Sequence, residues 1–284
     1  MLRPGRLVGR TCLIVGGTSG IGLASARRFL EEGARIVVTG RDPEIGRTPL
    51  EQLAPFGSAS EFSLELDQGE EGIARMFAFA LDALGGRLDV LLHVAGISGR
   101  KFGDGPLHDC STEGWERVMR TNAEGAFLTN RAAVRLMLDQ PIDANGLRGT
   151  VVNVGSVLDR SPSPVHFGTI AYAASKGAIR SMTLSAAARY AADHIRFNLL
   201  VPGLIDTPMA ARATNDSRIR NYLATKQPIA AGPGSADDVA DAALYLCEPA
   251  SRFVTGAELV VDGGWSVSEG LEEGEAPSEP NHSS

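Results

Sequence analysis

The chain has 284 residues, of which 43% are hydrophobic and 21% charged, an ordinary composition for a soluble globular protein. Its net charge of −7 argues against a surface for nucleic acid or for anionic membranes, and no apolar run approaches the ~18 residues of a membrane span. The three cysteines form no Cys-x-x-Cys pair, so they predict neither a disulfide framework nor a metal site, and a reducing, cytoplasmic location is expected.

Short apolar runs alternate with helix-length segments along the chain. The runs are continuous instead of alternating in polarity, which is typical of strands buried on both faces of a parallel sheet. Seven strands are predicted, at 11–16, 35–40, 62–67, 88–96, 150–156, 195–203 and 257–264. The main helices are predicted at 21–33, 70–84, 112–138, 172–192, 208–224 and 236–247.

This order predicts a single α/β domain over residues 1–267, with a doubly wound parallel sheet of seven strands and helices on both faces. No internal repeat or linker divides it. The remaining stretch, 268–284, has five glutamates and no basic residue, so it is expected to be a disordered acidic tail.

Three glycines, Gly16, Gly20 and Gly22, stand between the first strand and the first helix. Glycine permits a sharp turn and a close approach of the backbone to a ligand because it has no Cβ atom. The amino end of the following helix offers unpaired N–H groups and a positive dipole to a pyrophosphate. The position of the motif favours a dinucleotide cradle over an ordinary glycine-rich turn. The residues expected to contact the cofactor here are Gly16, Thr18, Ser19, Gly20, Ile21 and Gly22.

The end of the second strand bears on the choice of cofactor. About twenty residues after the glycines, where this kind of fold usually places an acid on the ribose 2′-hydroxyl, the chain has Gly40 followed by Arg41. The missing acid and the adjacent arginine favour a 2′-phosphate, and therefore NADP(H) over NAD(H). Two alternatives stay open: Arg41 is a solvated loop residue, or Asp42 pairs with Arg41 or holds a ribose itself.

Tyr172 and Lys176, in the stretch "YAASK", form a second candidate group. Their spacing of four places them one turn apart on the same face of a helix. A nearby ammonium group favours a phenolate, so Lys176 is expected to lower the pKa of Tyr172 toward the range of a general acid or base. Ser156 ends the fifth strand, at the edge of the sheet where ligands of α/β folds bind.

Because of the glycine motif, Ser156, Tyr172 and Lys176, the sequence resembles the short-chain dehydrogenase/reductase family over roughly residues 8–267. Further support comes from "RTNAEGAFL", "VPGLIDTPM" and "TGAELVVDGG". The resemblance implies a Rossmann-like fold and an oxidoreductase that interconverts a secondary alcohol and a ketone by hydride transfer with NAD(P)(H). The alternative is a dinucleotide-binding regulatory or sensor protein on the same scaffold, which would not need the Tyr/Lys pair.

The resemblance also implies catalytic roles by position. Tyr172 would donate the proton in reduction and accept it in oxidation, and Ser156 would hydrogen-bond the substrate oxygen. Lys176 would lower the pKa of the tyrosine and bind the nicotinamide ribose. Asn122 would kink its helix and hold a water molecule of a proton relay behind the lysine.

Cofactor contacts are implied in the same way. Asp67 matches the position at the adenine amino group, and Gly96, next to Ala95, matches the backbone beside the adenine ribose. Thr207 and the backbone of Ile205 match the positions at the nicotinamide carboxamide. The rest of the expected set is Pro202 and Gly203, together with Tyr172 and Lys176.

The sequence departs from the family pattern at two places. Val15 stands where the family usually has threonine, and His93-Val94 stands where it usually has two asparagines. Those polar side chains normally tie the first turn to the fourth strand, so their absence bears on the stiffness of the cofactor platform. His93 itself is expected to be a satisfied buried histidine and not a proton-transfer group.

Three segments, 97–110, 157–171 and 204–230, are expected to frame the pocket for a small carbonyl or alcohol substrate. Apolar residues in the third segment are expected to form a lid or, alternatively, to pack as a surface helix on the core: Met209, Ile219, Tyr222 and Leu223. One hypothesis is that the substrate is anionic, and this hypothesis rests on Arg100, Lys101, Arg160, His166 and Arg212. The alternative is that these residues are only solvated loop charges. The resemblance also implies a homotetramer.

Overall fold

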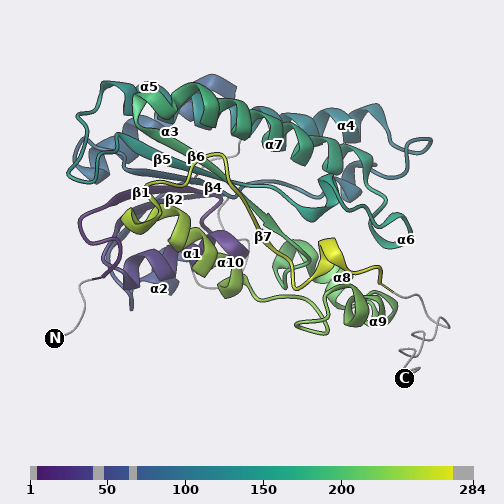
Figure 1. Ribbon diagram of the computed structural model, residues 1–284. Coiled ribbons are helices and arrows are strands. Elements are labelled where there is room, and N and C mark those ends of the chain that lie inside the picture. The colour runs from purple at the N-terminus through teal and green to yellow at the C-terminus, as the bar shows by residue number, and fades with distance from the viewer. Residues whose placement is uncertain (1–4, 41–47, 64–68, 271–284) are drawn as a thin grey trace.

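The computed structural model describes residues 5–40, 48–63 and 69–270 (Figure 1). Its centre is a parallel sheet of seven strands in the order β3-β2-β1-β4-β5-β6-β7. The strands are β1 (Thr11–Val15), β2 (Arg35–Gly40), β3 (Ala59–Ser63), β4 (Val90–His93), β5 (Gly149–Val154), β6 (Ile195–Pro202) and β7 (Glu258–Val261). The predicted doubly wound, Rossmann-like single domain is confirmed.

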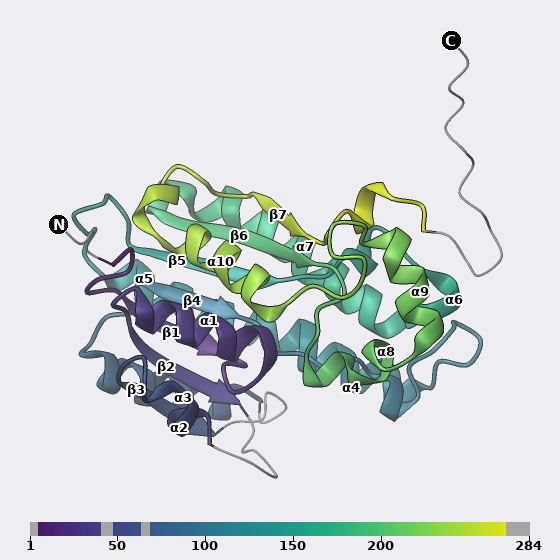
Figure 2. The same ribbon diagram turned by 90° about the horizontal axis from the view of Figure 1, so that it is seen from below.

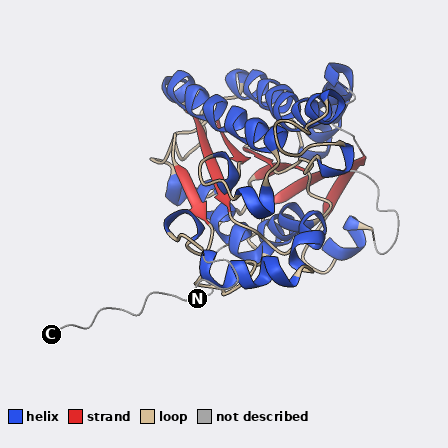
Figure 3. Cartoon of the chain, turned by 90° about the vertical axis from the view of Figure 1, so that its right-hand side faces the viewer, coloured by secondary structure: helices blue, strands red, loops and turns tan. Residues whose placement is uncertain are grey.

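The helices lie in two layers on opposite faces of this sheet (Figures 1 and 3). One layer contains α1 (Gly20–Glu31), α2 (Pro49–Leu53) and α10 (Ala236–Cys247). The other contains α3 (Gly69–Leu84), α4 (Thr112–Val118), α5 (Gly125–Asp139) and α7 (Ile170–Tyr190). Three shorter helices lie beyond the carboxyl ends of the strands: α6 (Pro164–Phe167), α8 (Ala211–Thr214) and α9 (Ser217–Lys226). Figure 2 shows this for α8 and α9.

Two apolar cores explain why the strands are continuous apolar runs. Successive residues of a strand point to opposite faces of the sheet. Ile14 therefore packs with Phe29 beneath α1 and α10, whereas Leu13 packs with Met76 beneath α3 and α5. Both faces of each central strand are covered, so the strands are mostly apolar, and the polar residues that they do contain, such as Asn153 and Asn198, are buried and hydrogen-bonded.

The third strand differs from its prediction. The run 62–67 is predicted, but the strand begins at Ala59 and pairs with β2 from Ile36↔Ala59 to Gly40↔Ser63. Residues 64–67 of the predicted strand lie outside the described residues. Because β3 is an edge strand and is only partly buried, it does not need the apolar run on which the prediction depends.

Two predicted helices are interrupted. The segment 112–138 contains a π-helical turn, Met119–Glu124, between α4 and α5, which agrees with the expected kink at Asn122. The segment 208–224 begins with a 3-10 turn, Pro208–Ala210, and continues as α8 and α9 with a break between them.

The strand order reverses direction between β1 and β4. The chain leaves β1 toward β2 and β3 and returns to the other side of β1 at β4, where Val15 lies opposite His93. Such a reversal opens a crevice at the carboxyl ends of the two strands, which is where ligands bind in open α/β sheets.

The far end of the predicted tail also falls outside the described residues, which end at 270. Of its first residues, Ser268 packs against α9, and its carbonyl oxygen accepts a hydrogen bond from Lys226 Nζ. Within the described parts of the chain, no helix has the length and apolar character needed to cross a bilayer, and no cluster of potential metal ligands occurs.

Candidate active site

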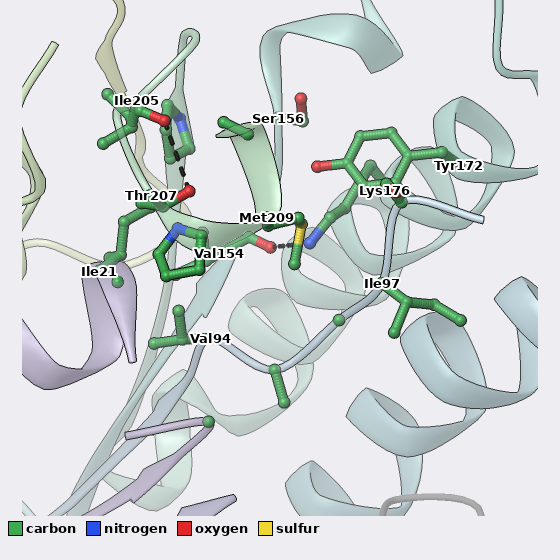
Figure 4. Close-up of a pocket in the computed structure, with 18 of the residues that line it drawn as sticks. Ile21, Val94, Ile97, Val154, Ser156, Tyr172, Lys176, Ile205, Thr207 and Met209 are labelled. Atoms are coloured by element: carbon green, nitrogen blue, oxygen red, sulfur yellow. Dashed lines mark hydrogen bonds between the residues drawn. The ribbon is translucent and has the colours of Figure 1, made fainter. Parts of the chain in front are cut away.

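A cavity of about 660 Å³ occupies this crevice (Figure 4). Its floor is made by the turns that follow β1, β4, β5 and β6, and its outer wall by parts of all three segments expected to frame the pocket. The predicted site residues that line it are Gly16, Thr18, Ser19, Gly20, Ile21, Ala95, Gly96, Ser156, Tyr172, Lys176, Pro202, Gly203, Ile205 and Thr207.

The glycine turn after β1 has no room for side chains. Gly16 has a φ of +85°, and a Cβ atom there would lie 2.7 Å from the backbone nitrogen of Ala95. Gly22 does not line the cavity but supports the turn from below, where a Cβ atom would lie 2.0 Å from the carbonyl oxygen of Gly16. The turn is therefore compact enough for its backbone to face a ligand closely.

The amino end of α1 completes this cradle. Its N-cap residue, Ser19, makes no side-chain capping hydrogen bond, and the first turn of the helix contains no acidic residue. The N–H groups of that turn and the positive end of the helix dipole are thus available to an anion. These residues fit the pyrophosphate of a dinucleotide.

The two departures from the family pattern do not leave the turn untied, because backbone hydrogen bonds hold it. The carbonyl oxygen of Val15 accepts from the N–H groups of Val94 and Ala95, at 2.9 and 3.0 Å. On the other side, the carbonyl oxygen of Thr39 accepts from Gly16 and Gly17, both at 2.8 Å. The cofactor platform is therefore fastened to both neighbouring strands without polar side chains.

His93 is buried at the end of β4, as expected. Its Nδ1 lies 2.9 Å from Thr129 Oγ1, but no hydrogen-bond partner of Nε2 is found among the described residues, so the ring is satisfied at one nitrogen and not at both as expected. Burial, with the nearby charge of Lys176, lowers the pKa of His93 to about 3. The ring is thus neutral at physiological pH, which does not suit a proton-transfer group.

Tyr172, Ser156 and Lys176 come together at the inner end of the cavity, and Figure 4 shows the three side chains beside one another. Tyr172 lies in the first turn of α7, and Ser156 follows β5. Lys176 lies one turn further along α7, where Nζ donates a 2.9 Å hydrogen bond to the carbonyl oxygen of Val154 and lies 5.7 Å from the centroid of the Tyr172 ring.

The pKa of Tyr172 is raised and not lowered, and Lys176 is not among the groups that shift it. Burial raises the pKa of Tyr172, and hydrogen bonding to the Ser156 side chain opposes this rise only in part. The lysine ammonium is directed to the Val154 carbonyl and lies over the ring. Burial also lowers the pKa of Lys176 to about 8.

Asn122 lies in the π-helical turn and is completely buried. Its Oδ1 accepts from the N–H of Ile97 at 2.8 Å, and its Nδ2 donates to the carbonyl oxygen of Ile97 at 3.1 Å and to Ser175 Oγ at 3.0 Å. The side-chain amide thus joins the start of the first substrate segment to the helix that carries Tyr172 and Lys176.

Asp104, which no motif of the sequence marks, is buried in the first substrate segment. Its carboxylate accepts from the backbone N–H groups of Ala171 and Tyr172, at 2.9 and 3.0 Å. It therefore caps α7, since Thr169, the N-cap residue by position, makes no side-chain capping bond.

The segment after β6 closes the cavity over the glycine turn. Thr207 Oγ1 lies 3.4 Å from the carbonyl oxygen of Ile205, the contact drawn in Figure 4. A Cβ atom on Gly20 would lie 3.0 Å from the Thr207 methyl group, so the two predicted cofactor contacts face each other. Arg41, Asp42 and Asp67 lie outside the described residues.

The four apolar residues of the third segment divide between the two alternatives. Met209 lines the cavity and is half-exposed, as a lid residue would be. Ile219, Tyr222 and Leu223 are instead buried against Trp265 in a third apolar cluster. For these three, the alternative of a helix packed on the core is the correct one.

Comparison with known proteins agrees with this geometry. A family model described as "Enoyl-(Acyl carrier protein) reductase" matches residues 15–266. A solved structure of a short-chain type dehydrogenase/reductase from Mycobacterium ulcerans superposes with a TM-score of 0.81 and 28% identity, covering 92% of this chain and 91% of that one. The chain belongs to the short-chain dehydrogenase/reductase family.

Curated members of the family are similar over nearly their full length. The 2,5-dichloro-2,5-cyclohexadiene-1,4-diol dehydrogenase of Sphingobium indicum is 32% identical, over 92% of this chain and 98% of its own. The NADP-dependent (R)-specific alcohol dehydrogenase of Lentilactobacillus kefiri is 33% identical, with the same coverage of 92% and 98%. The chain is thus an oxidoreductase of a family that uses NAD(P) and acts on alcohol and carbonyl groups.

Proposed function

We propose that this protein interconverts a secondary alcohol and a ketone by hydride transfer, with NADP(H) as the favoured cofactor and Tyr172 as the general acid/base. The observation that carries the proposal is the convergence of Tyr172, Ser156 and Lys176 at one end of a cavity whose other end is the glycine turn and the amino end of α1. A proton-transfer group and a dinucleotide cradle thus share one space.

Bound NAD(P)(H) supplies or accepts the hydride, and the protein handles the proton. In reduction, the O–H bond of Tyr172 breaks and its proton passes to the substrate oxygen. Because burial raises the pKa of Tyr172, the phenol is protonated at neutral pH and ready to donate. Ser156 donates a second hydrogen bond to the same oxygen and stabilises the charge that develops on it.

Lys176 and Asn122 act behind the phenol. Lys176 is positively charged below its pKa of about 8, and its charge favours the tyrosinate that remains after the proton has left. Its ammonium group is also placed to bind the nicotinamide ribose. We assign Asn122 the task of fixing the backbone at Ile97 beside the lysine, and with it the water of the proton relay.

The preference for NADP(H) is supported by the end of β2. A Cβ atom on Gly40 would lie 2.0 Å from Thr18 Oγ1, so the strand end has no room for the acidic side chain that usually binds a ribose 2′-hydroxyl. Arg41, the next residue, is our candidate for the 2′-phosphate, and Asp67 for the adenine amino group. One relative is named an NADP-dependent alcohol dehydrogenase.

A regulatory or sensor protein on the same scaffold is the second candidate function. Such a protein would bind the dinucleotide in the same cradle but would not need a tyrosine, a serine and a lysine side by side. The two functions differ in one measurement, which is turnover.

The test begins with calorimetric titration of the protein with NADPH and, separately, NADH. We expect tighter binding of NADPH, and turnover of ketones or alcohols from a broad panel. Tyr172→Phe should bind the cofactor as tightly as the wild type and lose at least ~10²-fold in kcat, since a general acid contributes about this much. Tight cofactor binding without any turnover would favour the sensor, and binding of neither cofactor would overturn both functions.

We further propose that the chain assembles as a homotetramer. Large apolar side chains are exposed on elements that the family resemblance assigns to interfaces, among them Phe127 on α5 and Val260 on β7. Phe253, shortly before β7, is fully exposed. Burial of such side chains between copies stabilises an assembly. Light scattering that gives the mass of a single chain would refute the tetramer.

A further inference from the structure

Among the described residues, the cavity is lined by cations and by no acid. Arg100, Lys101, Arg117 and Arg212 are lining residues there, whereas no Asp or Glu of the described chain lines the cavity. The chain as a whole has a net charge of −7. The mouth of the cavity is therefore a positive region on an acidic protein, an arrangement that attracts anionic ligands.

Two of the nearby arginines are already neutralised by carboxylates. Arg160, one of the residues behind the anionic-substrate hypothesis, does not line the cavity, and its guanidinium pairs with Glu258 at 2.6 Å. This part of the hypothesis is wrong. Arg218, near the cavity mouth, pairs with Asp216 at 3.5 Å. Neither guanidinium needs a ligand for charge compensation.

Arg100 and Arg212 are different, because each faces the positive charge of the other. Burial, and after it the charge of Arg212, lowers the pKa of Arg100. Neither forms an ion pair with a carboxylate of the described residues; Arg100 donates instead to the carbonyl oxygen of His166, at 3.0 Å. Asp104 is the acid that acts on Arg100, and both of its oxygens are committed to the amino end of α7.

The location of this pair separates it from the cofactor. Arg100 and Arg212 line both the main cavity and an adjoining side chamber of about 280 Å³. The other residues of that chamber are Val165, His166, Asp216, Arg218 and Ile219, and none comes from the glycine turn. The one acid among these residues, Asp216, is paired with Arg218. The pair thus lies at the substrate end of the cavity, away from the pyrophosphate cradle.

We propose that Arg100 and Arg212 together bind an oxyanion of the substrate, a carboxylate or a phosphate, while its carbonyl or hydroxyl group lies at Ser156 and Tyr172. This inference rests on the proposed function of the site. A guanidinium binds either oxyanion through two parallel hydrogen bonds, and an anion between the two arginines relieves their mutual repulsion. Apolar residues of the cavity wall, such as Leu158 and Phe167, suit an apolar chain between the two polar ends.

The first experiment measures binding. The protein is saturated with the oxidised form of its preferred cofactor, which has no hydride to give, so that ketones bind without being reduced. Three series are then titrated calorimetrically: methyl-ketone carboxylates of increasing chain length, their methyl esters and their phosphonate counterparts. We expect the anions to bind and the esters to bind about tenfold or more weakly, with the same loss for Arg100→Gln and for Arg212→Gln. The matched control is Arg220→Gln, at an exposed position of α9 that lines neither the cavity nor the side chamber, and it should bind like the wild type.

The second experiment measures turnover of the same compounds. The two glutamine variants should raise KM for the anions much more than KM for the esters. Arg212→Lys keeps the positive charge but not the two parallel hydrogen bonds, so its KM for the anions should be intermediate. The carboxylate and phosphonate series show which oxyanion fits. Equal affinity for esters and anions, or an unchanged anion affinity in both glutamine variants, overturns the oxyanion site.

These outcomes distinguish the site from the proposed function. Turnover of neutral ketones without any preference for anions leaves the alcohol–ketone reaction standing and removes the oxyanion site. Anion binding that is lost only in the Arg100 and Arg212 variants, without turnover of any compound, supports the oxyanion site and contradicts the proposed reaction.

Discussion

The carboxylate of Asp104 lies 3.0 Å from the backbone nitrogen of Tyr172 and accepts its hydrogen bond. A second bond, of 2.9 Å, comes from the N–H of Ala171. A residue of the first substrate segment thus fixes the start of the helix from which the phenol enters the cavity. Its influence on the reaction would pass through the position of Tyr172, so we regard Asp104 as a positioning residue.

Asp104→Ala should lower both stability and turnover. Two buried N–H groups lose a charged acceptor, a loss that costs about 2–4 kcal/mol in unfolding free energy. We expect a lower melting temperature and a kcat reduced about tenfold or more, because Tyr172 is less well held. Asp104→Asn keeps one acceptor oxygen, so its melting temperature and its kcat should lie between those of the wild type and those of Asp104→Ala. A purely structural role would predict a lower melting temperature with kcat unchanged, which would refute positioning.

Lys176→Met should abolish turnover and change how stability depends on pH. Burial lowers the pKa of Lys176 to about 8 from its usual 10.5, so the unfolded chain binds more protons between these values. The wild type is therefore expected to gain stability as the pH rises through about 8 to 10.5. The methionine variant should lack this gain and be more stable at pH 7, by up to about 3 kcal/mol.

Chemical denaturation at a series of pH values checks this expectation. Lys101→Met, at an exposed position, is the matched control and should keep the wild-type profile. In activity, kcat/KM for ketone reduction by the wild type should fall above pH ~8, as the ammonium beside Tyr172 loses its charge. A stability profile that is the same for wild type and Lys176→Met would contradict the lowered pKa.

Gly22→Ala should prevent cofactor binding. The new Cβ atom would lie 2.0 Å from the carbonyl oxygen of Gly16, a backbone atom that can move only if the turn deforms. Such overpacking also costs about 1–3 kcal/mol in stability. Gly105→Ala, where nothing lies within 4 Å of the added atom, should bind cofactor normally. Calorimetry compares the two variants, and unimpaired NADPH binding by Gly22→Ala would show that the turn is not the cradle.

Cofactor choice should respond to Gly40 and Thr18 jointly. Gly40→Asp alone should weaken binding of both cofactors, because its Cβ atom would clash with Thr18 Oγ1. Adding Thr18→Gly removes the clash and lets the carboxylate reach the ribose, so the double variant should prefer NADH. The ratio of the two dissociation constants is the readout. A single variant that already prefers NADH, with Thr18 in place, would refute the steric argument.

The parts of the fold that the sequence predicted are those that local patterns determine. Continuous apolar runs identify central strands such as β5, since both faces of the sheet are covered. The glycine turn is identified by its position between the first strand and the first helix. The edge strand β3 lacks this signature because it is only partly buried, and its start at Ala59 is set by pairing with Ile36. No pattern within 59–63 carries that information.

The site was predictable where one element carries the residues together. Tyr172 and Lys176 share a helix, so their spacing reveals them. Asp104 acts on a helix 68 residues later, and Arg160 is neutralised by Glu258 from the last strand. Contacts of this kind depend on how distant segments fold together. Composition and spacing alone could therefore neither identify Asp104 as a positioning residue nor exclude Arg160 from the substrate pocket.

The first substrate segment is fastened at two points: Asn122 holds its start at Ile97, and Asp104 locks onto the helix of Tyr172. The six residues between these anchors, 98–103, include Arg100 and reach the cavity from a fixed base. Substrate specificity can therefore be changed by substitutions within 98–103 that leave the catalytic residues in place. A library of variants confined to 98–103 would change substrate specificity and keep both anchors. Longer loop replacements that remove Asp104 would also remove the hydrogen bonds that hold Tyr172 in position.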